Sequence, residues 1–286
     1  MKVEINGRKI GLVLSGGGAK GAYQVGMFKA LEEYGLSENI TAMSGCSIGA
    51  YAEVIYALRG YHAYMDFLLD FEKMMNSGRV LQDSVVEQAQ KDVQDGKVSK
   101  QQFISESRFW KYEPVELYGY FRDIVSNDAI RKSGIPMSVC DYSIEEDRPV
   151  YFKLNDLTEE EQVNAIIGSG SLQFLFPPCE VKGHHCLDGG AVPDICEYPA
   201  AKDKIPLKPI VNEDVDVVFI NFLIAIDYVD LSMIPRTKKF VELRPSRLLE
   251  DYPGSGTLDF TPDKLRQHAD LGYKDTVHLI QKNFSF

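Results

Sequence analysis

The fold that we expect for this chain follows from two glycine-rich stretches, Gly16-Gly17-Gly18-Ala19-Lys20-Gly21 and Gly45-Cys46-Ser47-Ile48-Gly49. Residues 9–14 precede the first stretch and residues 40–44 precede the second, and both runs are short and largely apolar, as buried strands are. An apolar pattern of helical spacing follows each stretch. Each stretch therefore joins a strand to a helix, and strands that alternate with helices predict a parallel sheet covered by helices.

The second stretch has the pattern G-x-S-x-G, in which a sharp strand-to-helix turn exposes the serine hydroxyl as a nucleophile. Glycine at both ends of the pattern fits such a turn, because a Cβ atom there would collide with the neighbouring strand or helix. We expect the helix after Ser47 to end near Gly60. Taken alone, the pattern is equally consistent with a tight turn that contains an incidental serine.

The first stretch offers what such a serine needs, a loop of backbone N–H groups at a helix start that can hold a developing oxyanion. We predict that this oxyanion hole is formed by Gly16, Gly17 and Gly18. Lys20 either adds positive potential to the cleft or lies on the surface. The stretch also fits a dinucleotide fingerprint, but residues 44–46 lack the acidic residue that this fingerprint requires. A P-loop is excluded as well, because Gly rather than Ser or Thr follows Lys20.

A third stretch, Asp188-Gly189-Gly190, follows a short predicted strand and by itself indicates only a turn. The three stretches together, in this order, resemble the patatin-like phospholipase family. Residues 168–178 and 272–275 resemble two further segments of that family. The resemblance covers roughly residues 8–60 and 135–195 well and the region between them hardly at all. The chain departs from the common family residues at Cys46, Gly168, Ser171 and Gln173.

The resemblance implies a catalytic dyad without a histidine, in which Ser47 is the nucleophile and Asp188 is the general base. Burial would help the aspartate, because it raises the pKa of a carboxyl above its reference of about 3.9. The resemblance further implies a carboxylic ester hydrolase that cleaves phospholipids, lysophospholipids or related acyl lipids through an acyl-enzyme. No cofactor and no metal are implied. The residues that would support the motifs are Lys20, Gly21, Gly45, Gly49, Gly189 and Gly190.

For the fold, the resemblance implies the α/β class, with three α/β/α layers, a mainly parallel central sheet and a helical insert. We expect one domain over residues 1–286, with the insert at about 61–133. The insert's aromatic residues either form its own core or contact acyl chains or a membrane. Predicted helices lie at 64–75, 83–94, 114–124 and 158–167, a capping box lies at 99–102, and strands lie at 135–142, 150–154 and 216–222.

Two other interpretations remain open. A Ser-Asp-His triad of the α/β-hydrolase type would use His268, which lies on a helix that opens at residues 261–263. The helical pattern instead favours a packed histidine on the apolar face. A non-catalytic lipid-binding module that kept the fold is the second alternative. A zinc site at Cys179, His184, His185 and Cys186 is disfavoured by their spacing, which favours a hairpin.

Composition excludes some functions. The formal net charge of −11 argues against a nucleic-acid partner. No apolar run reaches the length of a membrane span, and residues 1–9 show no apolar signal region. Five cysteines in a chain of 286 residues fit a reducing compartment rather than a disulfide framework. We therefore expect a cytoplasmic protein with an acyl lipid as substrate. Peripheral contact with a membrane and the oligomeric state stay open.

Overall fold

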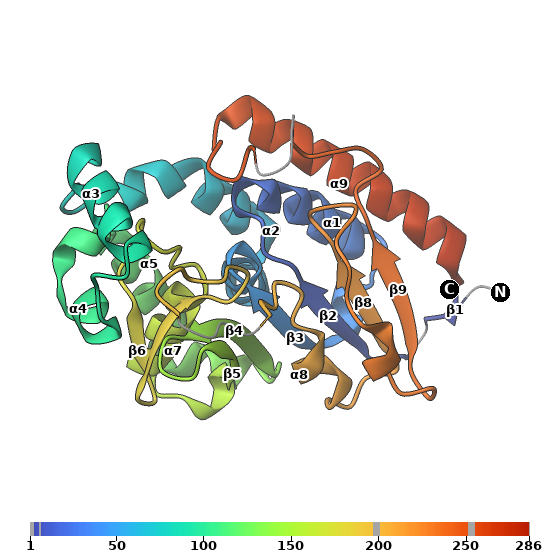
Figure 1. Cartoon of the computed structure of the whole chain (residues 1–286). Helices are drawn as coiled ribbons and strands as arrows, with labels where there is room; N and C mark the ends of the chain where they lie inside the picture. The colour runs from blue at the N-terminus through green and yellow to red at the C-terminus, as the bar shows by residue number, and fades with distance from the viewer. Residues whose placement is uncertain (1–2, 6, 197–200, 251–254, 286) are drawn as a thin grey trace.

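The computed structural model describes residues 3–5, 7–196, 201–250 and 255–285, and Figure 1 traces their path. We expected one domain over residues 1–286, and of these, residues 1–2, 6, 197–200, 251–254 and 286 lie outside the described residues. Within the described part of the chain, one eight-stranded sheet forms the centre of the molecule. Its order is β6 (Cys179–Val181), β7 (His184–Asp188), β4 (Met137–Ser143), β3 (Ile40–Cys46), β2 (Ile10–Leu14), β8 (Val217–Asn221) and β9 (Lys239–Leu243), with β5 (Arg148–Lys153) paired to β4.

The sheet is mainly parallel, as expected. Strands β4, β3, β2, β8 and β9 run parallel to one another, whereas β5 and β7 pair antiparallel with β4, and β6 pairs antiparallel with β7. The predicted strands are all present, including the short one before Asp188, and β6 and β7 form the hairpin expected around the two adjacent histidines. A separate pair of short parallel strands, β1 (Val3–Glu4) and β10 (Phe284–Ser285), brings the two ends of the chain together.

The central strands bury both faces, which is why they are apolar throughout rather than alternating. Leu12 and Leu14 of β2 point into a core with the long helices, and Val13 between them belongs to a second core on the opposite face. The first face is covered by α1 (Ala22–Glu33), α2 (Ile48–Met75), α7 (Glu159–Ser169) and α9 (Pro262–Asn283). Helix α9 lies along α1 at one side of the sheet (Figure 1).

The opposite face carries a thinner layer, built from the short helix α8 (Leu207–Val211) and the segments beside it. Three layers of the α/β/α type result, which confirms the predicted fold class. The remaining α-helix of the main body is α6 (Ala129–Ser133). The described residues also form short 3-10 helices: η1 (Gly18–Gly21), η2 (Ser37–Asn39), η3 (Ser107–Phe109), η4 (Ser126–Asp128), η5 (Leu154–Asp156) and η6 (Leu231–Met233). No described helix combines the length and the apolar character needed to cross a membrane.

Helix α2 differs from the prediction. We expected one helix to end near Gly60 and another to span 64–75, but α2 continues through this point to Met75. The backbone is broken only at Gly60, which has φ 81° and ψ 173°. Glycine tolerates this conformation at little cost, so the helix can change direction there and resume.

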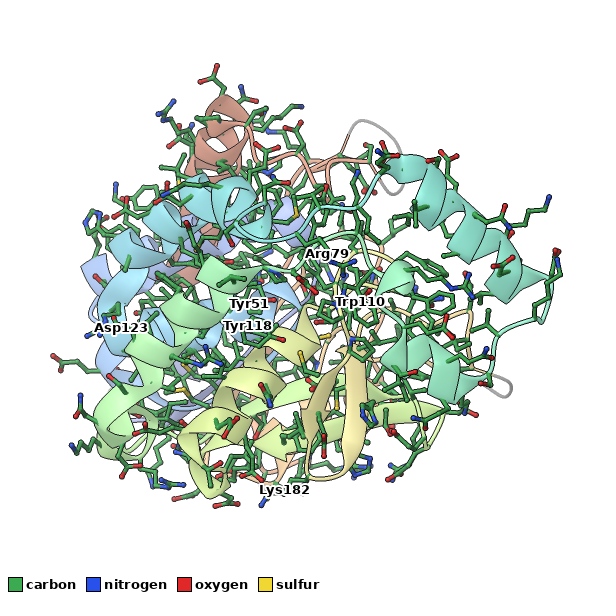
Figure 2. The ribbon with its side chains drawn as sticks, turned by 90° about the vertical axis from the view of Figure 1, so that its left-hand side faces the viewer. Tyr51, Arg79, Trp110, Tyr118, Asp123 and Lys182 are labelled. Atoms are coloured by element: carbon green, nitrogen blue, oxygen red, sulfur yellow. The ribbon has the colours of Figure 1, made fainter. Side chains whose placement is uncertain are left out.

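The region from 76 to 133 adds α3 (Asp83–Gln94), α4 (Lys100–Ser105) and α5 (Val115–Val125), close to the predicted positions. The predicted capping boxes at Ser99 and Thr158 are both formed. The aromatic residues divide between two cores: Phe103, Phe109 and Trp110 pack in a separate cluster, and Phe121 packs on α2 in the main core. Figure 2 shows Trp110 on one side of this region and Tyr118 near Tyr51 on the other. These aromatics are mostly buried, so the packing alternative describes them better than exposed membrane contact.

Candidate active site

Ser47 occupies a sharp turn between the end of β3 and the start of α2. Its φ of 56° and ψ of −127° lie in a region that residues with a Cβ rarely adopt, as expected at a nucleophile turn. The turn is tight because strand and helix backbones approach closely. A Cβ on Gly49 would lie 2.3 Å from the carbonyl oxygen of Leu14, so glycine is required at this position. The local sequence thus produces the turn that the G-x-S-x-G pattern predicts.

A buried serine from a distant segment holds this turn. The N–H of Ser47 donates to Oγ of Ser169 at 2.9 Å, and Oγ of Ser169 donates to the carbonyl of Cys140 at 2.7 Å. Ser169 is fully buried at the end of α7. A bond of this kind offsets part of the cost of a strained backbone. The family resemblance includes residues 168–178, but it predicts no role for Ser169.

Asp188 lies at the end of β7, which is separated by β4 from the strand β3 that leads into Ser47. It is paired in register with Asp141 of β4, and the preceding residue of β4, Cys140, is paired with Cys46 of β3. Oδ1 of Asp188 accepts the N–H of Gly190 at 2.8 Å. Burial raises the pKa of Asp188 to about 6, although a side-chain hydrogen bond with Ser47, the Gly190 N–H and the charge of Lys202 act in the opposite direction. The structure therefore brings the two predicted residues together.

The glycine loop after β2 faces the same point. The N–H of Gly16 is committed to the carbonyl of Lys204 at 2.9 Å, and that of Ala19 to the carbonyl of Thr257 at 2.9 Å. The N–H groups of Gly17 and Gly18 are not donors in any hydrogen bond between described residues. Of the three predicted oxyanion glycines, these two have N–H groups that no acceptor in the described part of the chain takes.

Gly18 has φ +60°, and a Cβ on it would lie 2.0 Å from the carbonyl oxygen of Thr257. The other motif glycines also sit at close backbone or side-chain approaches. A Cβ would meet an atom within 3.0 Å at Gly16, Gly17, Gly21, Gly45, Gly189 and Gly190.

Lys20 is buried, which contradicts the surface alternative. Its ammonium pairs with Glu250 at 3.0 Å and donates to the carbonyl of Ser255 at 3.1 Å and to the hydroxyl of Thr257 at 3.3 Å. Lys20 thus joins the glycine loop to a segment more than 200 residues away in sequence. The negative charge of Glu250 largely offsets that of Lys20. Lys20 therefore contributes to the site by fixing the position of the glycine loop as much as by adding positive potential.

These groups line one cavity of about 160 Å³. Its polar side is formed by Ser47, Asp188 and the glycine loop, and its apolar side by Leu172 and Ile224. The full lining is Gly16, Gly17, Gly18, Lys20, Ser47, Leu172, Asp188, Gly190, Ala191, Lys204, Ile224 and Thr257. A nucleophile, a carboxyl with a raised pKa and free N–H donors around one small space can carry out acyl transfer.

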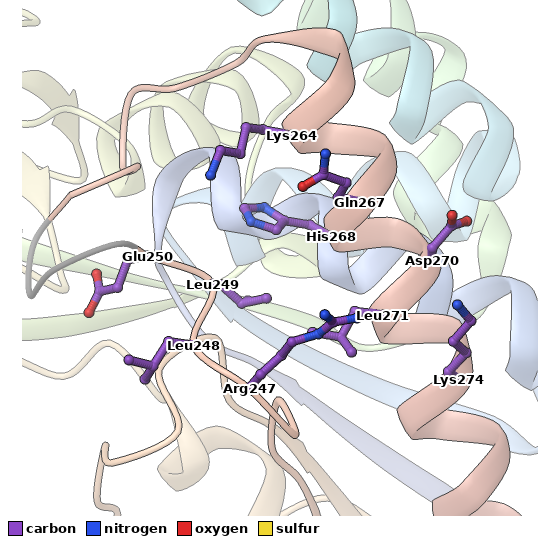
Figure 3. A pocket seen from close by; sticks show the side chains of 10 residues that line it. All are labelled: Arg247, Leu248, Leu249, Glu250, Lys264, Gln267, His268, Asp270, Leu271 and Lys274. Atoms are coloured by element: carbon purple, nitrogen blue, oxygen red, sulfur yellow. The ribbon is translucent and has the colours of Figure 1, made fainter.

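His268 lies in a different hollow, shown in Figure 3. This hollow of about 330 Å³ is lined mainly by α9 and by residues 247–250. His268 is packed on α9 as the helical pattern predicts, and its Nδ1 has no hydrogen-bond partner among the described residues. Burial lowers the pKa of His268, and Lys264 and Lys20 lower it further, while Ala19 and Asp259 oppose the shift. The imidazole is neither a lining residue of the Ser47 cavity nor among the groups that shift the pKa of Asp188.

The adjacent histidines of the β6–β7 hairpin are tied to acids instead of gathering around a metal site. His185 contacts Glu145 at 2.6 Å, and His184 lies 3.4 Å from Glu146. Among the described residues, no group of three His, Cys, Asp or Glu side chains is arranged to hold a metal ion.

Sequence reasoning missed the segment that joins the two catalytic loops. The N–H of Asp203 donates to the carbonyl of Gly189 at 2.9 Å, and the next residue, Lys204, accepts the N–H of Gly16. Lys204 also lines the cavity and pairs with Asp227 at 2.7 Å. No local pattern marks these residues, because their role depends on backbone contacts with segments far away in the sequence.

Comparison with known proteins places this geometry in a family. The family model of the patatin-like phospholipases matches residues 12–200, more than half of the chain. A lysophospholipase NTE1 of Cryptococcus neoformans var. neoformans serotype D is 53% identical over 51 residues, which are 18% of this chain and 3% of that protein. A lysophospholipase NTE1 of Kluyveromyces lactis is 29% identical over 201 residues, 67% of this chain and 12% of that protein. The chain thus spans only a small part of the length of these relatives.

Among solved structures, VipD from Legionella pneumophila aligns with 99% of this chain and 71% of its own, with 18% identity and a TM-score of 0.49. The family match covers three segments that the fold brings to one cavity: the glycine loop at 16–21, the Ser47 turn and the Asp188 turn. From this match, the chain belongs to the patatin-like phospholipase family.

Proposed function

We propose that the chain is a serine-dependent lipid acyl hydrolase of the phospholipase A or lysophospholipase type, with Ser47 as nucleophile and Asp188 as general base. The observation that carries this proposal is the interaction of the Ser47 hydroxyl with a buried aspartate, in a cavity that is also lined by Gly17 and Gly18, whose N–H groups donate to no described residue. The names of the curated relatives support a lysophospholipid or phospholipid as substrate.

The reaction begins when Oγ of Ser47 attacks the carbonyl carbon of the ester and its proton passes to the carboxylate of Asp188. The N–H groups of Gly17 and Gly18 stabilise the negative charge on the former carbonyl oxygen. The tetrahedral intermediate collapses with loss of the alcohol, whose oxygen takes the proton from Asp188. Water then attacks the acyl-enzyme, gives its proton to Asp188, and the fatty acid leaves as the proton returns to Ser47.

The raised pKa of Asp188 suits both halves of this cycle. A carboxyl with a pKa of about 6 is largely ionised at neutral pH, so it can accept the serine proton. It is also a stronger base than an exposed aspartate, and its conjugate acid still donates readily to the departing alcohol. Burial in the cavity is the main cause of the shift, so the fold itself tunes the base.

We further propose that the described elements belong to one domain over 1–286, in which residues 61–133 form an insert. The support is a single sheet whose strands come from before and after the insert. Peripheral contact with a membrane is part of the proposal, because the substrate is a lipid. Ile226 and Tyr228, which are 84% and 81% exposed, lie on the loop that follows Ile224 of the cavity wall.

The alternatives have less support. A triad would need His268 between Ser47 and Asp188, but His268 lines another hollow. A non-catalytic lipid-binding module would not need a strained serine beside a buried aspartate, since binding alone uses neither.

The test is hydrolysis of a short-chain p-nitrophenyl ester and of a lysophospholipid by the wild type, Ser47→Ala and Asp188→Asn. Labelling with a fluorophosphonate is measured beside it. We expect both variants to lose at least about a thousandfold in kcat with retained folding, and only Ser47→Ala to lose the labelled residue itself. A wild type that is neither labelled nor active on any ester would favour the binding module. An active Asp188→Asn variant would remove the proposed base.

A further inference from the structure

A second hollow adjoins the catalytic cavity. It measures about 630 Å³ and shares Lys204 with the cavity that contains Ser47. Its walls are Tyr151, the segment from Ala201 to Lys208, and the loop that follows β8, including Asp227, Tyr228, Asp230 and Met233. The hollow is larger than the cavity beside it, and nothing in the proposed reaction uses it.

The floor of this hollow is fixed to both catalytic loops. Asp203 donates its N–H to Gly189 of the Asp-Gly-Gly turn, and Lys204 accepts the N–H of Gly16. A molecule bound against residues 201–208 would therefore keep a constant position relative to Ser47 and the oxyanion donors. The charge of Lys202 already reaches the carboxyl of Asp188, where it lowers the pKa. The two spaces are close enough for one ligand to occupy both.

The lysines and aspartates that line the hollow are equal in number, Lys202, Lys204 and Lys208 against Asp203, Asp227 and Asp230, but they are not paired one to one. Two of its acids are committed inside the protein: Asp227 pairs with Lys204 at 2.7 Å, and Asp203 accepts the Tyr151 hydroxyl at 2.5 Å and the Ile205 N–H at 3.2 Å. Within the described residues, neither Lys202 nor Lys208 makes an ion pair, and Lys208 lies 5.5 Å from the centre of the Tyr151 ring. The third acid, Asp230, accepts the Ser232 N–H and makes no ion pair among the described residues. The ammonium groups of Lys202 and Lys208 therefore have no ion-pair partner there and can meet an anion, although the charge of Lys208 also acts on Asp203.

We propose that this hollow binds the phosphate of a phospholipid headgroup, with Lys202 and Lys208 as its donors. The proposal rests on the proposed function, because it requires that the ester bound at Ser47 belong to a glycerophospholipid. In such a lipid the ester and the phosphate are joined through glycerol, so both must be accommodated at neighbouring sites. Lysine ammonium groups are compact donors that suit phosphate oxygens. Asp230 and the exposed Tyr228 ring lie at the rim, where a headgroup amine would meet them.

The test compares two substrates with the same short acyl chain, a lysophosphatidylcholine and a monoacylglycerol, each below its critical micelle concentration. The monoacylglycerol carries the ester and the glycerol but no phosphate. The variants are Lys202→Gln, Lys208→Gln and the double variant, with Lys239→Gln as the matched control. Lys239 is an exposed lysine at the start of β9, at the opposite end of the strands from the hollow.

We expect the double variant to lose about tenfold in kcat/KM for the lysophosphatidylcholine and to stay within twofold for the monoacylglycerol. The rates are measured at pH 8, where Asp188 is ionised with or without the charge of Lys202, which is the smallest of the causes that shift its pKa. The ratio of the two substrates is decisive, because any remaining effect on Asp188 stays within the twofold range and is common to both. Lys202→Arg should keep the ratio, and Lys239→Gln should change neither substrate. Equal losses on both substrates, or none, would overturn the headgroup site while leaving the hydrolase intact.

Inorganic phosphate separates a lipid headgroup from a free anion. If the hollow serves the headgroup, phosphate at millimolar concentration should leave monoacylglycerol hydrolysis unchanged and should weaken lysophosphatidylcholine hydrolysis at most modestly. Tight inhibition by phosphate of both substrates, abolished in the double variant, would indicate a site for the free anion and contradict the proposal. If the wild type hydrolyses no substrate, the proposed function itself fails, which is a different result from equal losses in the lysine variants.

Discussion

The hollow at Ser47 and the hollow at His268 both contain groups that sequence reasoning offered as catalytic, but they are built in different ways. At Ser47, the nucleophile and the carboxyl lie at strand ends joined through β4. The Ser47 N–H donates to the hydroxyl of Ser169, and the Gly190 N–H donates to the carboxylate of Asp188. At His268, the imidazole lies on one face of α9, and its pKa is lowered first by burial and then by the charge of nearby lysines. The register of paired strands fixes the positions of two reacting groups relative to each other. A group on a single helix face is positioned only by the side chains that pack around it.

The difference teaches where to look for the base. A histidine that acts on a serine needs a carboxyl behind it and a proton affinity near neutral pH. His268 has nearby lysines and a lowered pKa, and it is packed beside the back of the glycine loop at Ala19. Asp188 has a raised pKa and interacts with the serine itself. The predictions below test this contrast, from the largest expected effect to the smallest.

The glycine loop should be the most sensitive part of the Ser47 hollow. Gly18→Ala places a Cβ about where the Thr257 carbonyl lies, 2.0 Å away, and we expect it to lower kcat by about a hundredfold or more. Gly35→Ala is the matched control, because Gly35 also has positive φ, +68°, but its Cβ would meet no atom within 4 Å. That control should cost about 1 kcal/mol of stability and leave kcat unchanged. Equal kcat losses in both variants, measured on the p-nitrophenyl ester, would show that backbone strain alone explains the effect.

The contrast also explains what could be predicted from the sequence. The strands, the Ser47 turn and the Asp188 turn follow from local signals, namely apolar runs and glycines that permit close backbone approach. Ser169, Lys204 and the partner of Lys20 could not be found this way. Ser169 holds a residue 122 positions away, and Lys20 pairs with one 230 positions away, so their roles exist only after folding. The continuation of α2 past Gly60 was missed because a glycine there reads as a helix end.

Ser169 should matter for rate more than for stability. Ser169→Ala removes the acceptor of the Ser47 N–H, and we expect kcat to fall ten- to thirtyfold with little change in KM. Ser171→Ala is the control, since Ser171 is equally buried and its hydroxyl bonds only to the Ile167 carbonyl and near Cys179. Both variants should lose about 1 kcal/mol of stability. The rate of fluorophosphonate labelling separates them, and a slow Ser171→Ala variant would mean that the segment acts as a whole.

The pH profile should report Asp188. Because the base works ionised and its pKa is about 6, kcat/KM should be flat above pH 7 and fall about tenfold by pH 5. The stability change has the opposite sign. The pKa of Asp188 in the folded state lies above that of an unfolded aspartate, about 3.9, so the folded state binds the proton first as the pH falls from 6 towards 4, and through this group folding is favoured there. The measurements are kcat/KM and the melting temperature at pH 7 and pH 5. A fall in kcat/KM without a fall in melting temperature would agree with both predicted directions. A constant kcat/KM down to pH 5 would contradict Asp188 as the base.

The His268 hollow should give the smallest effect. His268→Gln keeps a polar side chain of similar length on α9 and removes the imidazole, so in a dyad enzyme kcat/KM should change by no more than about two- to threefold. The residual effect would come through packing against the glycine loop at Ala19, because the imidazole lies behind that loop. The melting temperature and the pH profile are measured with the rate: a structural role shifts the first and leaves the second with its midpoint near 6. A loss of a hundredfold or more in a protein that still melts cooperatively, together with a flattened profile, would transfer the role of base to His268. It would then mean that the two hollows join in the working enzyme.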